Sequence, residues 1–256
     1  MRFTWRLKES VVSYEGWCSR IAEKDDAPGR SARSLAMAWA GPVCLAGALS
    51  HHADLLDLCI ETAAVEAQTA FDSFPGGKRN HDLLLTGVTR GGKAIVSIES
   101  KADEEFGQTV RQYLAGAQKK LDRGETTNAR ERLEGLVNAL IDHRTLADDQ
   151  VLDLRYQLLS GVAGAVAAAV EHGAANAVFL VHEFVTDETA VALRQRNASD
   201  LHSFGLTVFD LEFPATAEVP WCVGPLRFAG NGERLSSNVK LYVAKATTDW
   251  RTRGDT

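Results

Sequence analysis

Two apolar segments in the middle of the chain, 81–88 and 93–101, flank the turn sequence TRGG. Glycine accepts the positive φ angles that tight hairpin turns require, so this pattern predicts an antiparallel β-hairpin. A continuous apolar run, AVFLVHEF at 177–184, is typical of a central strand that is covered on both faces. Further strands are expected at 206–211, 221–228 and 239–244.

Helical spacing predicts most of the remaining elements. Apolar residues at positions 55, 56, 59 and 63 have the spacing of an amphipathic helix over 53–70, and the Pro-Gly pair at 28–29 separates two earlier helices. The segment 74–80, which contains FPGG, is expected as a loop. The expected helices are 9–24, 32–40, 53–70, 104–121 and 151–172, with a polar helical insertion over 123–149.

This order of elements predicts an α/β protein with a central mixed β-sheet flanked by helices. Its 256 residues are enough for a large α/β core. We expect an N-terminal helical segment over 1–50, a core over 51–184, a β-rich C-terminal extension over 185–246 packed on that core, and a frayed tail over 247–256.

Composition excludes several classes of protein. The hydrophobic fraction of 45% and the charged fraction of 24% exclude a disordered, collagen-like or coiled-coil chain. No apolar run is long enough to span a membrane and the first residues lack the apolar stretch of a secretory signal, so a cytoplasmic protein is expected. Four scattered cysteines without a C-x-x-C pair argue against a disulfide framework or a zinc ribbon and favour reduced thiols.

The formal net charge of −6 limits how this protein could bind nucleic acid. Binding to nucleic acid depends on neutralising phosphates, so a protein that uses its whole surface for it is usually basic. Any such site here is expected at a local basic patch or through bound cations. The residues Lys78, Arg79, Arg90 and Lys93 are the candidates for a basic cluster near the hairpin.

Three ionisable residues of the hairpin are the main candidates for chemistry. Residues two apart on a strand share a face, so Glu99 and Lys101 point the same way, and antiparallel pairing brings Asp82 beside them. Carboxylates with a strand carbonyl suit a hard divalent cation such as Mg²⁺ or Mn²⁺. A third carboxylate is expected from the preceding helix: Glu66 lies on its inward stripe, with Glu61 as second choice.

Together these features resemble the PD-(D/E)xK nuclease superfamily, with His81 standing where the superfamily's name has proline. Three segments resemble more specifically an uncharacterised bacterial family within that superfamily: FPGG leading to His81-Asp82, IESK leading to EEFG, and LRYQLL at 154–159. The resemblance implies a restriction-endonuclease-like fold that cuts DNA or RNA, although some members of the superfamily have lost catalysis. It also implies that Glu66, Asp82 and Glu99 are metal ligands and that Lys101 is the catalytic lysine.

The expected function is therefore the metal-dependent hydrolysis of phosphodiester bonds in nucleic acid, with DNA favoured as the substrate and Lys101 positioning the attacking water. Lys78, Arg79, Arg155 and Gln157 are candidate contacts to nucleic acid, although Arg155 and Gln157 fit solvent exposure equally well. Two alternatives stay open: a catalytically inactive binding or regulatory module with the same fold, and a hydrolase of small phosphate compounds. A homodimer or a protein partner is compatible with each.

Overall fold

The fold is described from a computed structural model that places residues 4–5, 30–38, 47–50, 52–214 and 219–251. The elements in chain order are β1 (Thr4–Trp5), α2 (Ser31–Ala38), η2 (Ala53–Leu55), β2 (Cys59–Thr69), β3 (Arg79–Thr89), β4 (Gly92–Lys101), α4 (Val110–Asp122), α5 (Ala129–Leu140), α6 (Asp149–Leu152), α7 (Tyr156–Glu171), β5 (Asn176–Val185), α8 (Val191–Phe209), β6 (Trp221–Leu226) and β7 (Lys240–Asp249).

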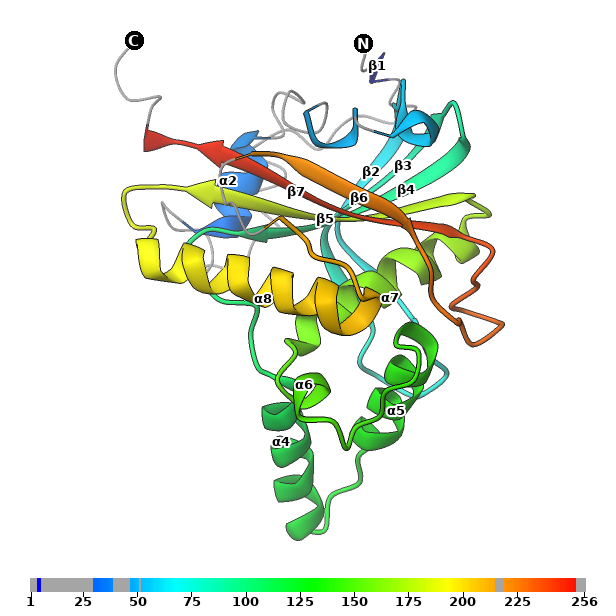
Figure 1. The fold of residues 1–256 in the computed structure, drawn as a ribbon, viewed down its shortest axis with the longest axis vertical. Helices are drawn as coiled ribbons and strands as arrows, with labels where there is room; N and C mark the ends of the chain where they lie inside the picture. The colour runs from blue at the N-terminus through cyan, green and yellow to red at the C-terminus, as the bar shows by residue number, and fades with distance from the viewer. Residues whose placement is uncertain (1–3, 6–29, 39–46, 51, 215–218, 252–256) are drawn as a thin grey trace.

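A single mixed sheet organises these elements, with its described strands in the order β1-β2-β3-β4-β5-β7-β6 (Figure 1). β2, β3 and β4 form an antiparallel meander, and β5 and β7 then join parallel to β4. β6 closes one edge in the antiparallel sense, while β1 pairs parallel to β2 at the other edge. The expected mixed sheet flanked by helices is confirmed.

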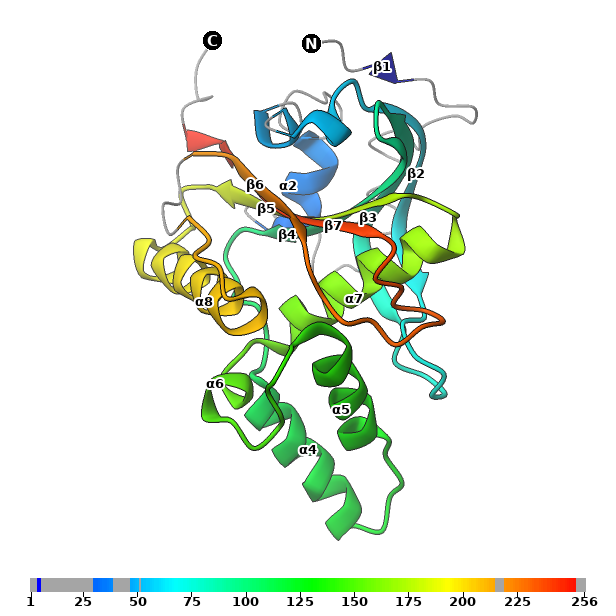
Figure 2. The ribbon, with the colours of Figure 1, turned by 45° about the vertical axis from the view of Figure 1, so that its right-hand side comes forward.

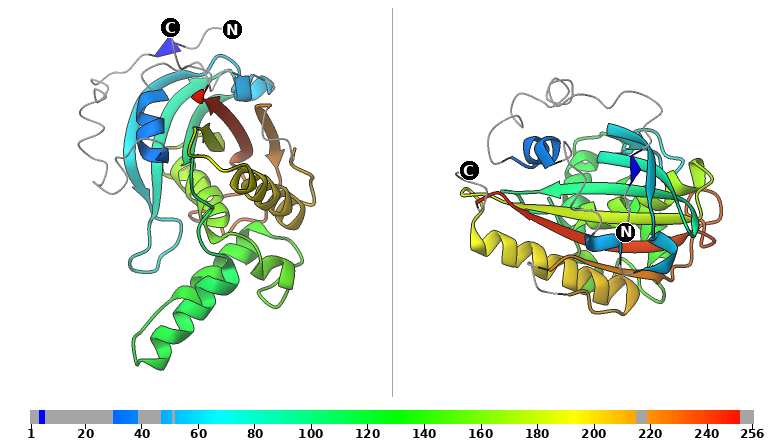
Figure 3. Two further views of the ribbon diagram at one scale, coloured as in Figure 1. Left: turned by 90° about the vertical axis from the view of Figure 1, so that its left-hand side faces the viewer. Right: turned by 90° about the horizontal axis from the view of Figure 1, so that it is seen from above.

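The parallel pairing of β4 with β5 requires a crossover connection, and the chain supplies it through α4 to α7. α7 and α8 cover one face of the sheet and α2 covers the other (Figure 2). α4 and α5 pair with each other and project away from the sheet as a helical arm (Figure 3).

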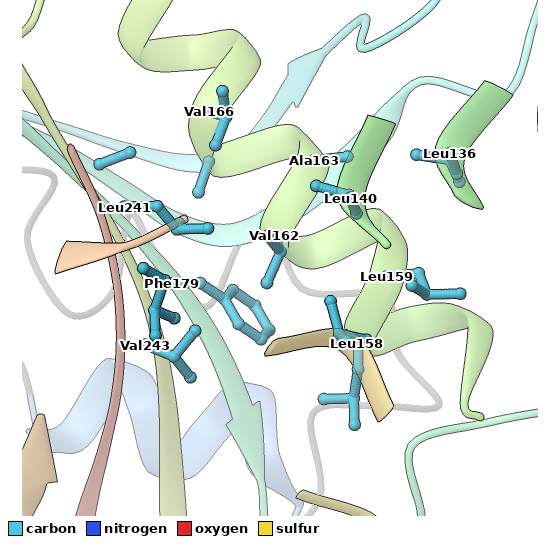
Figure 4. Packing of buried hydrophobic residues seen from close by; sticks show 14 of the residues in the cluster. Leu136, Leu140, Leu158, Leu159, Val162, Ala163, Val166, Phe179, Leu241 and Val243 are labelled. Atoms are coloured by element: carbon cyan, nitrogen blue, oxygen red, sulfur yellow. The ribbon is translucent and has the colours of Figure 1, made fainter. Parts of the chain in front are cut away.

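Strand alternation divides the core into two apolar clusters, one on each face of the sheet. On β5, Phe179 and Val181 face α7, whereas Val178 and Leu180 face α2. Figure 4 shows the α7 side, where Phe179 lies near leucine and valine side chains from α7 and β7, and leucines of α5 belong to the same cluster. β5 is buried along its whole length, as its apolar sequence predicts.

Two glycines let α7 approach the sheet closely. A Cβ atom on Gly161 would lie 2.5 Å from Cε2 of Phe179, and one on Gly164 would lie 2.6 Å from Cγ of Arg79 and 3.0 Å from Cε1 of His81. Such distances are too short for van der Waals contact, so larger residues at either position would push the helix outward.

The structure confirms the central hairpin, since β3 and β4 pair antiparallel around the TRGG turn. The helix expected over 53–70 is wrong: after the short η2, residues 59–69 form β2 and pair with β3. The segment CIETAAVEAQT is rich in residues that favour helices, but its sheet partner decides the conformation.

Other boundaries also differ from expectation. The strand expected at 206–211 is wrong, because residues 206–209 belong to α8, a helix that the sequence patterns did not indicate. The helix expected from 104 begins only at Val110, where Thr109 and Gln112 form a capping box. The helix expected over 9–24 lies outside the described residues.

The C-terminal region belongs to the same sheet as the core, because β7 pairs directly with β5 and β6 pairs with β7. β7 also extends to Asp249, into the segment expected as a frayed tail. Cys59 and Cys222 are free thiols, as expected. None of the helices in the described ranges is both long and apolar enough to cross a membrane.

The close approach of α7 gives a testable contrast between two glycines. We expect Gly161→Ala to lower the free energy of unfolding by about 1–3 kcal/mol, because the added methyl group overpacks against Phe179. Gly116→Ala on α4 should raise it by about 0.5–1 kcal/mol, since no atom lies within 4 Å of the new methyl group and alanine favours helix. Chemical denaturation measures both, and equal effects would contradict the packing described here.

Candidate functional site

The backbone pairing between β3 and β4 ends at Leu83 and Ile98. Beyond that pair, the side chain of Asp82 on β3 bonds to β4 instead. Oδ2 of Asp82 accepts hydrogen bonds from the Ser100 backbone N–H at 2.7 Å and from the Ser100 hydroxyl at 2.6 Å. The Asp82 carboxylate thus satisfies a backbone donor of β4 where the two strands part.

The neighbouring strand β2 has an irregular backbone at Glu66, next to Asp82 of β3. Glu66, which lies between the residues paired with His81 and Leu83, has a positive φ of 52°. Val65 packs against the cluster on the α2 side, whereas Ala67 packs against the cluster on the α7 side. Residues two apart on a regular strand share a face, so the alternation of side chains along β2 is interrupted at Glu66.

Glu99 is the centre of the charged cluster and is buried on the α7 side of the sheet. Its Oε1 accepts from Nζ of Lys101 at 2.7 Å and from Nε2 of Gln157 on α7, and its Oε2 accepts from Nη2 of Arg79. Burial raises the pKa of the Glu99 carboxyl, but the charges of Lys101 and Arg79 outweigh burial and the pKa is lowered overall. Glu99 is therefore ionised at neutral pH.

The pKa of Asp82 is raised, whereas that of Glu99 is lowered. Burial raises the pKa of its carboxyl from 3.8 to about 7, and the negative charge of Glu99 adds to this effect. The charge of Lys101 and the hydrogen bonds from Ser100 lower the pKa of Asp82, but by less than burial and Glu99 raise it. One ionised carboxylate thus lies beside another that is half protonated near neutral pH, an arrangement common in functional sites.

Lys101 is buried, and three carboxylates act on its charge. Burial lowers the pKa of the ammonium group, but the charges of Glu99, Asp82 and Glu104 raise it above its ordinary value of 10.5. Nζ also lies 5.6 Å from the centre of the Phe106 ring. Lys101 is a cation at neutral pH, so it can orient a water molecule or stabilise negative charge but cannot accept a proton.

The buried, neutral His81 forms hydrogen bonds next to the charged cluster. His81 bonds through Nδ1 to the Ser97 hydroxyl at 2.6 Å and through Nε2 to the Thr69 hydroxyl at 3.1 Å. Burial and then the charge of Arg79 lower its pKa to about 3. His81 therefore links β2, β3 and β4 as an uncharged residue.

Two of the residues chosen from the sequence lie elsewhere than expected. Glu66 does not face inward from a helix; it is exposed on β2 and accepts a hydrogen bond from Asn80. The structure brings Asp82, Glu99 and Lys101 together without it. Arg79 does not belong to a surface loop; it is buried and ion-paired with Glu99.

The remaining candidate cations do not form the expected basic cluster. Lys78 is exposed, but Arg90 and Lys93 lie at the hairpin turn, about 20 Å from Glu99 at roughly 3.3 Å per residue. Arg155 is held by Asp200 at 2.9 Å and by the Gly107 carbonyl at 2.6 Å, and has an additional ion pair to Glu105. Arg155 thus acts as a structural anchor.

Sequence patterns missed two features near the cluster. The contacts of Arg79 and Gln157 with Glu99 come from segments 20 and 58 residues away along the chain. A second buried charge group also lies beside the first, because Glu183 on β5 is the register partner of Lys101. Glu183 pairs with Lys245 on β7 at 3.2 Å and with Arg194 on α8 at 3.4 Å. Only the buried strand of Glu183 was visible in the sequence.

Asp82 and Glu99 are the residues of the cluster whose oxygen atoms could bind a cation. The described residues contain no group of three or more histidine, cysteine or acidic side chains arranged to hold a metal. Two carboxylates nevertheless fit Mg²⁺, which keeps several waters and is usually bound by one or two carboxylates together with substrate phosphates. The raised pKa of Asp82 also means that a cation there would relieve repulsion from Glu99.

The pKa of Asp82 predicts how stability depends on pH. Because the folded protein holds the proton to a higher pH than the unfolded chain, stability from this residue is greatest near pH 4 and falls as pH rises through 7. Asp82→Asn keeps an oxygen for the Ser100 bonds and removes the charge. We expect it to stabilise the protein at pH 8 by about 1–2 kcal/mol and by much less at pH 5.

Thermal unfolding in the presence of a chelator measures this effect. Glu66→Gln, which removes an exposed carboxylate outside the cluster, is the matched control and should leave stability nearly unchanged at both pH values. Equal stability of Asp82→Asn and wild type at pH 8 would contradict the raised pKa.

Comparison with known proteins adds a family assignment. No curated protein and no solved structure matches the chain significantly. One family model, described as a domain of unknown function (DUF6946), matches residues 10–250 and so includes strands β2 to β7, the arm and the charged cluster. The chain therefore belongs to the DUF6946 family.

Proposed function

We propose that this protein is a metal-dependent hydrolase of phosphodiester bonds in nucleic acid, with a restriction-endonuclease-like core. Support for the core comes from the order of its elements: the antiparallel strands β2, β3 and β4, the crossover helix α7, and β5 parallel to β4. The resemblance to the PD-(D/E)xK superfamily implies a central mixed sheet flanked by helices, with which this order of elements is compatible.

The observation that carries the proposal is the convergence of Asp82, Glu99 and Lys101 at the point where β3 and β4 part. The hairpin alone would align these residues, but burial and charge make them unlike an ordinary surface ion pair. Placing Glu99 and Lys101 in the interior beside the partly buried Asp82 is costly, and such clusters of perturbed charges are common in functional sites.

Asp82 and Glu99 would hold the divalent cation, Mg²⁺ or Mn²⁺, through their carboxylate oxygens. Such a cation polarises a phosphate and lowers the pKa of a bound water. Lys101, as a permanent cation, orients the attacking water and stabilises the negative charge that develops on the phosphate. The Gln157 amide, which donates to Oε1 of Glu99, fixes the orientation of that carboxylate.

Exposed lysines on two segments that adjoin the sheet favour a large anionic substrate over a small one. The arm of α4 and α5 leaves the sheet shortly after Lys101, and its exposed last turn on α4 carries Lys119 and Lys120. Loop 72–78, which carries exposed Lys78, is tied to α5 by the pair between Arg132 and Asp72. Cations on both segments would contact a phosphate backbone that runs past the site.

One observation favours the alternative of a catalytically inactive module. Arg79 and Lys101 together offset the charges of Glu99 and Asp82, so the cluster is balanced without a bound metal. A buried set of this kind could persist for the structure alone, and the domain would then act through binding.

Cleavage assays test the proposal. With Mg²⁺ or Mn²⁺, we expect wild type to cut plasmid or single-stranded DNA or RNA, and Asp82→Asn, Glu99→Gln and Lys101→Met to lose at least ~100-fold in rate. Glu66→Gln should keep full activity, because its carboxylate lies outside the cluster.

The outcomes separate the candidate functions. Cleavage of a small phosphodiester without cleavage of nucleic acid would favour the small-substrate hydrolase. Binding of nucleic acid without cleavage in any metal would favour the inactive module. Cleavage that survives Glu99→Gln would place the catalytic site elsewhere and overturn the proposal.

A further inference from the structure

Arg79 lies on the carboxylate that the proposed function assigns to the metal. Its Nη2 donates to Oε2 of Glu99, and only 8% of its side chain is exposed. The other oxygen of Glu99 already accepts from Lys101 and Gln157. Both oxygens of the carboxylate are therefore engaged by protein donors, and a metal that binds Oε2 competes with the positive charge of Arg79, the donor to that oxygen.

The site is built to accommodate this arginine. Gly164 on α7 leaves the space in which the aliphatic part of Arg79 lies, since a Cβ there would come within 2.6 Å of Cγ and 3.0 Å of Cβ of Arg79. Among the described residues, Nε of Arg79 and Oε1 of Gln157 are buried without a hydrogen-bond partner. The guanidinium group thus has donor capacity that Glu99 does not use.

Charge counting shows what a metal would change. Asp82 and Glu99 supply two negative charges when both are ionised, and Lys101 and Arg79 supply two positive charges. A divalent cation added to this balanced, buried set leaves two uncompensated positive charges, which is unfavourable in a medium of low polarity. An anionic phosphate that enters with the cation offsets this excess, by one charge for a phosphodiester and by up to two for a phosphate monoester.

Arginine is suited to make this exchange. Its planar guanidinium group binds carboxylate and phosphate oxygens in the same forked geometry. We propose that Arg79 is an internal counter-cation that occupies Glu99 until a divalent metal displaces it and that then binds a phosphate oxygen of the substrate. This inference rests on the proposed function and adds that metal and phosphate bind cooperatively.

Calorimetry with Mn²⁺, supported by electron paramagnetic resonance of the unbound ion, tests the inference without an activity assay. In wild type, thymidine 5′-monophosphate should tighten Mn²⁺ binding at least ~10-fold, and by linkage Mn²⁺ should tighten nucleotide binding equally. Arg79→Gln removes the competing cation, so it should bind Mn²⁺ alone about 10-fold tighter than wild type. The effect of the nucleotide should then fall below about 3-fold.

Two further variants act as controls. Arg90→Gln removes an exposed arginine that pairs with Asp57 at the far end of the hairpin, and it should behave as wild type. Arg79→Lys keeps a competing charge without the forked donor, so its Mn²⁺ affinity should stay close to that of wild type while the nucleotide effect weakens. Thermal unfolding checks that each variant is folded, and the wild-type coupling needs no variant.

The possible failures are distinguishable. If wild type binds Mn²⁺ and Glu99→Gln does not, but Arg79→Gln binds no tighter than wild type or the nucleotide has no effect on wild type, the role of Arg79 is overturned and the metal site stands. If wild type and Arg79→Gln both fail to bind Mn²⁺ even with the nucleotide, the metal site itself is overturned, and the proposed function with it.

Discussion

The close approach of α7 to the sheet determines how deeply the charged cluster is buried. Gly161 lies against Phe179 and Gly164 lies over Arg79 and His81, so the helix packs directly on the strands that carry the acidic residues. This position of the helix places Gln157, in its first turn, against Glu99. Larger side chains at the two glycines would separate the helix from the sheet and admit water to the cluster.

Burial at this depth makes each charge dependent on the others. The pKa of Glu99 is lowered and that of Lys101 is raised because each lies beside an opposite charge, whereas the pKa of Asp82 rises because its own neighbours do not compensate for burial. The site is thus a coupled set, and its residues are expected to show non-additive effects when they are changed together.

Much of this arrangement follows from local sequence, and the rest depends on partners distant in the chain. The TRGG turn and strand alternation were sufficient to predict the hairpin and the shared face of Glu99 and Lys101. The prediction of a helix around Glu66 was wrong. Alanine and glutamate favour a helix locally, but pairing with β3 imposes a strand. The contact of Arg79 with Glu99 depends on the space at Gly164, which no local pattern reveals.

The base of the helical arm is closed by backbone contacts. Val110 N–H donates to the Leu154 carbonyl at 2.8 Å, and Tyr156 N–H donates to the Gln108 carbonyl at 3.1 Å, where the chain leaves β4 and where it enters α7. These bonds hold the two ends of the intervening segment together at the edge of the core. Because the entropy cost of closing such a segment grows only slowly with its length, the outer part of the arm can be lengthened or shortened while the strands and α7 keep their positions, provided that the α5 side chains of the core are kept. The arm is thus the part of the molecule in which relatives can diverge in what they contact without rebuilding the cluster beneath it.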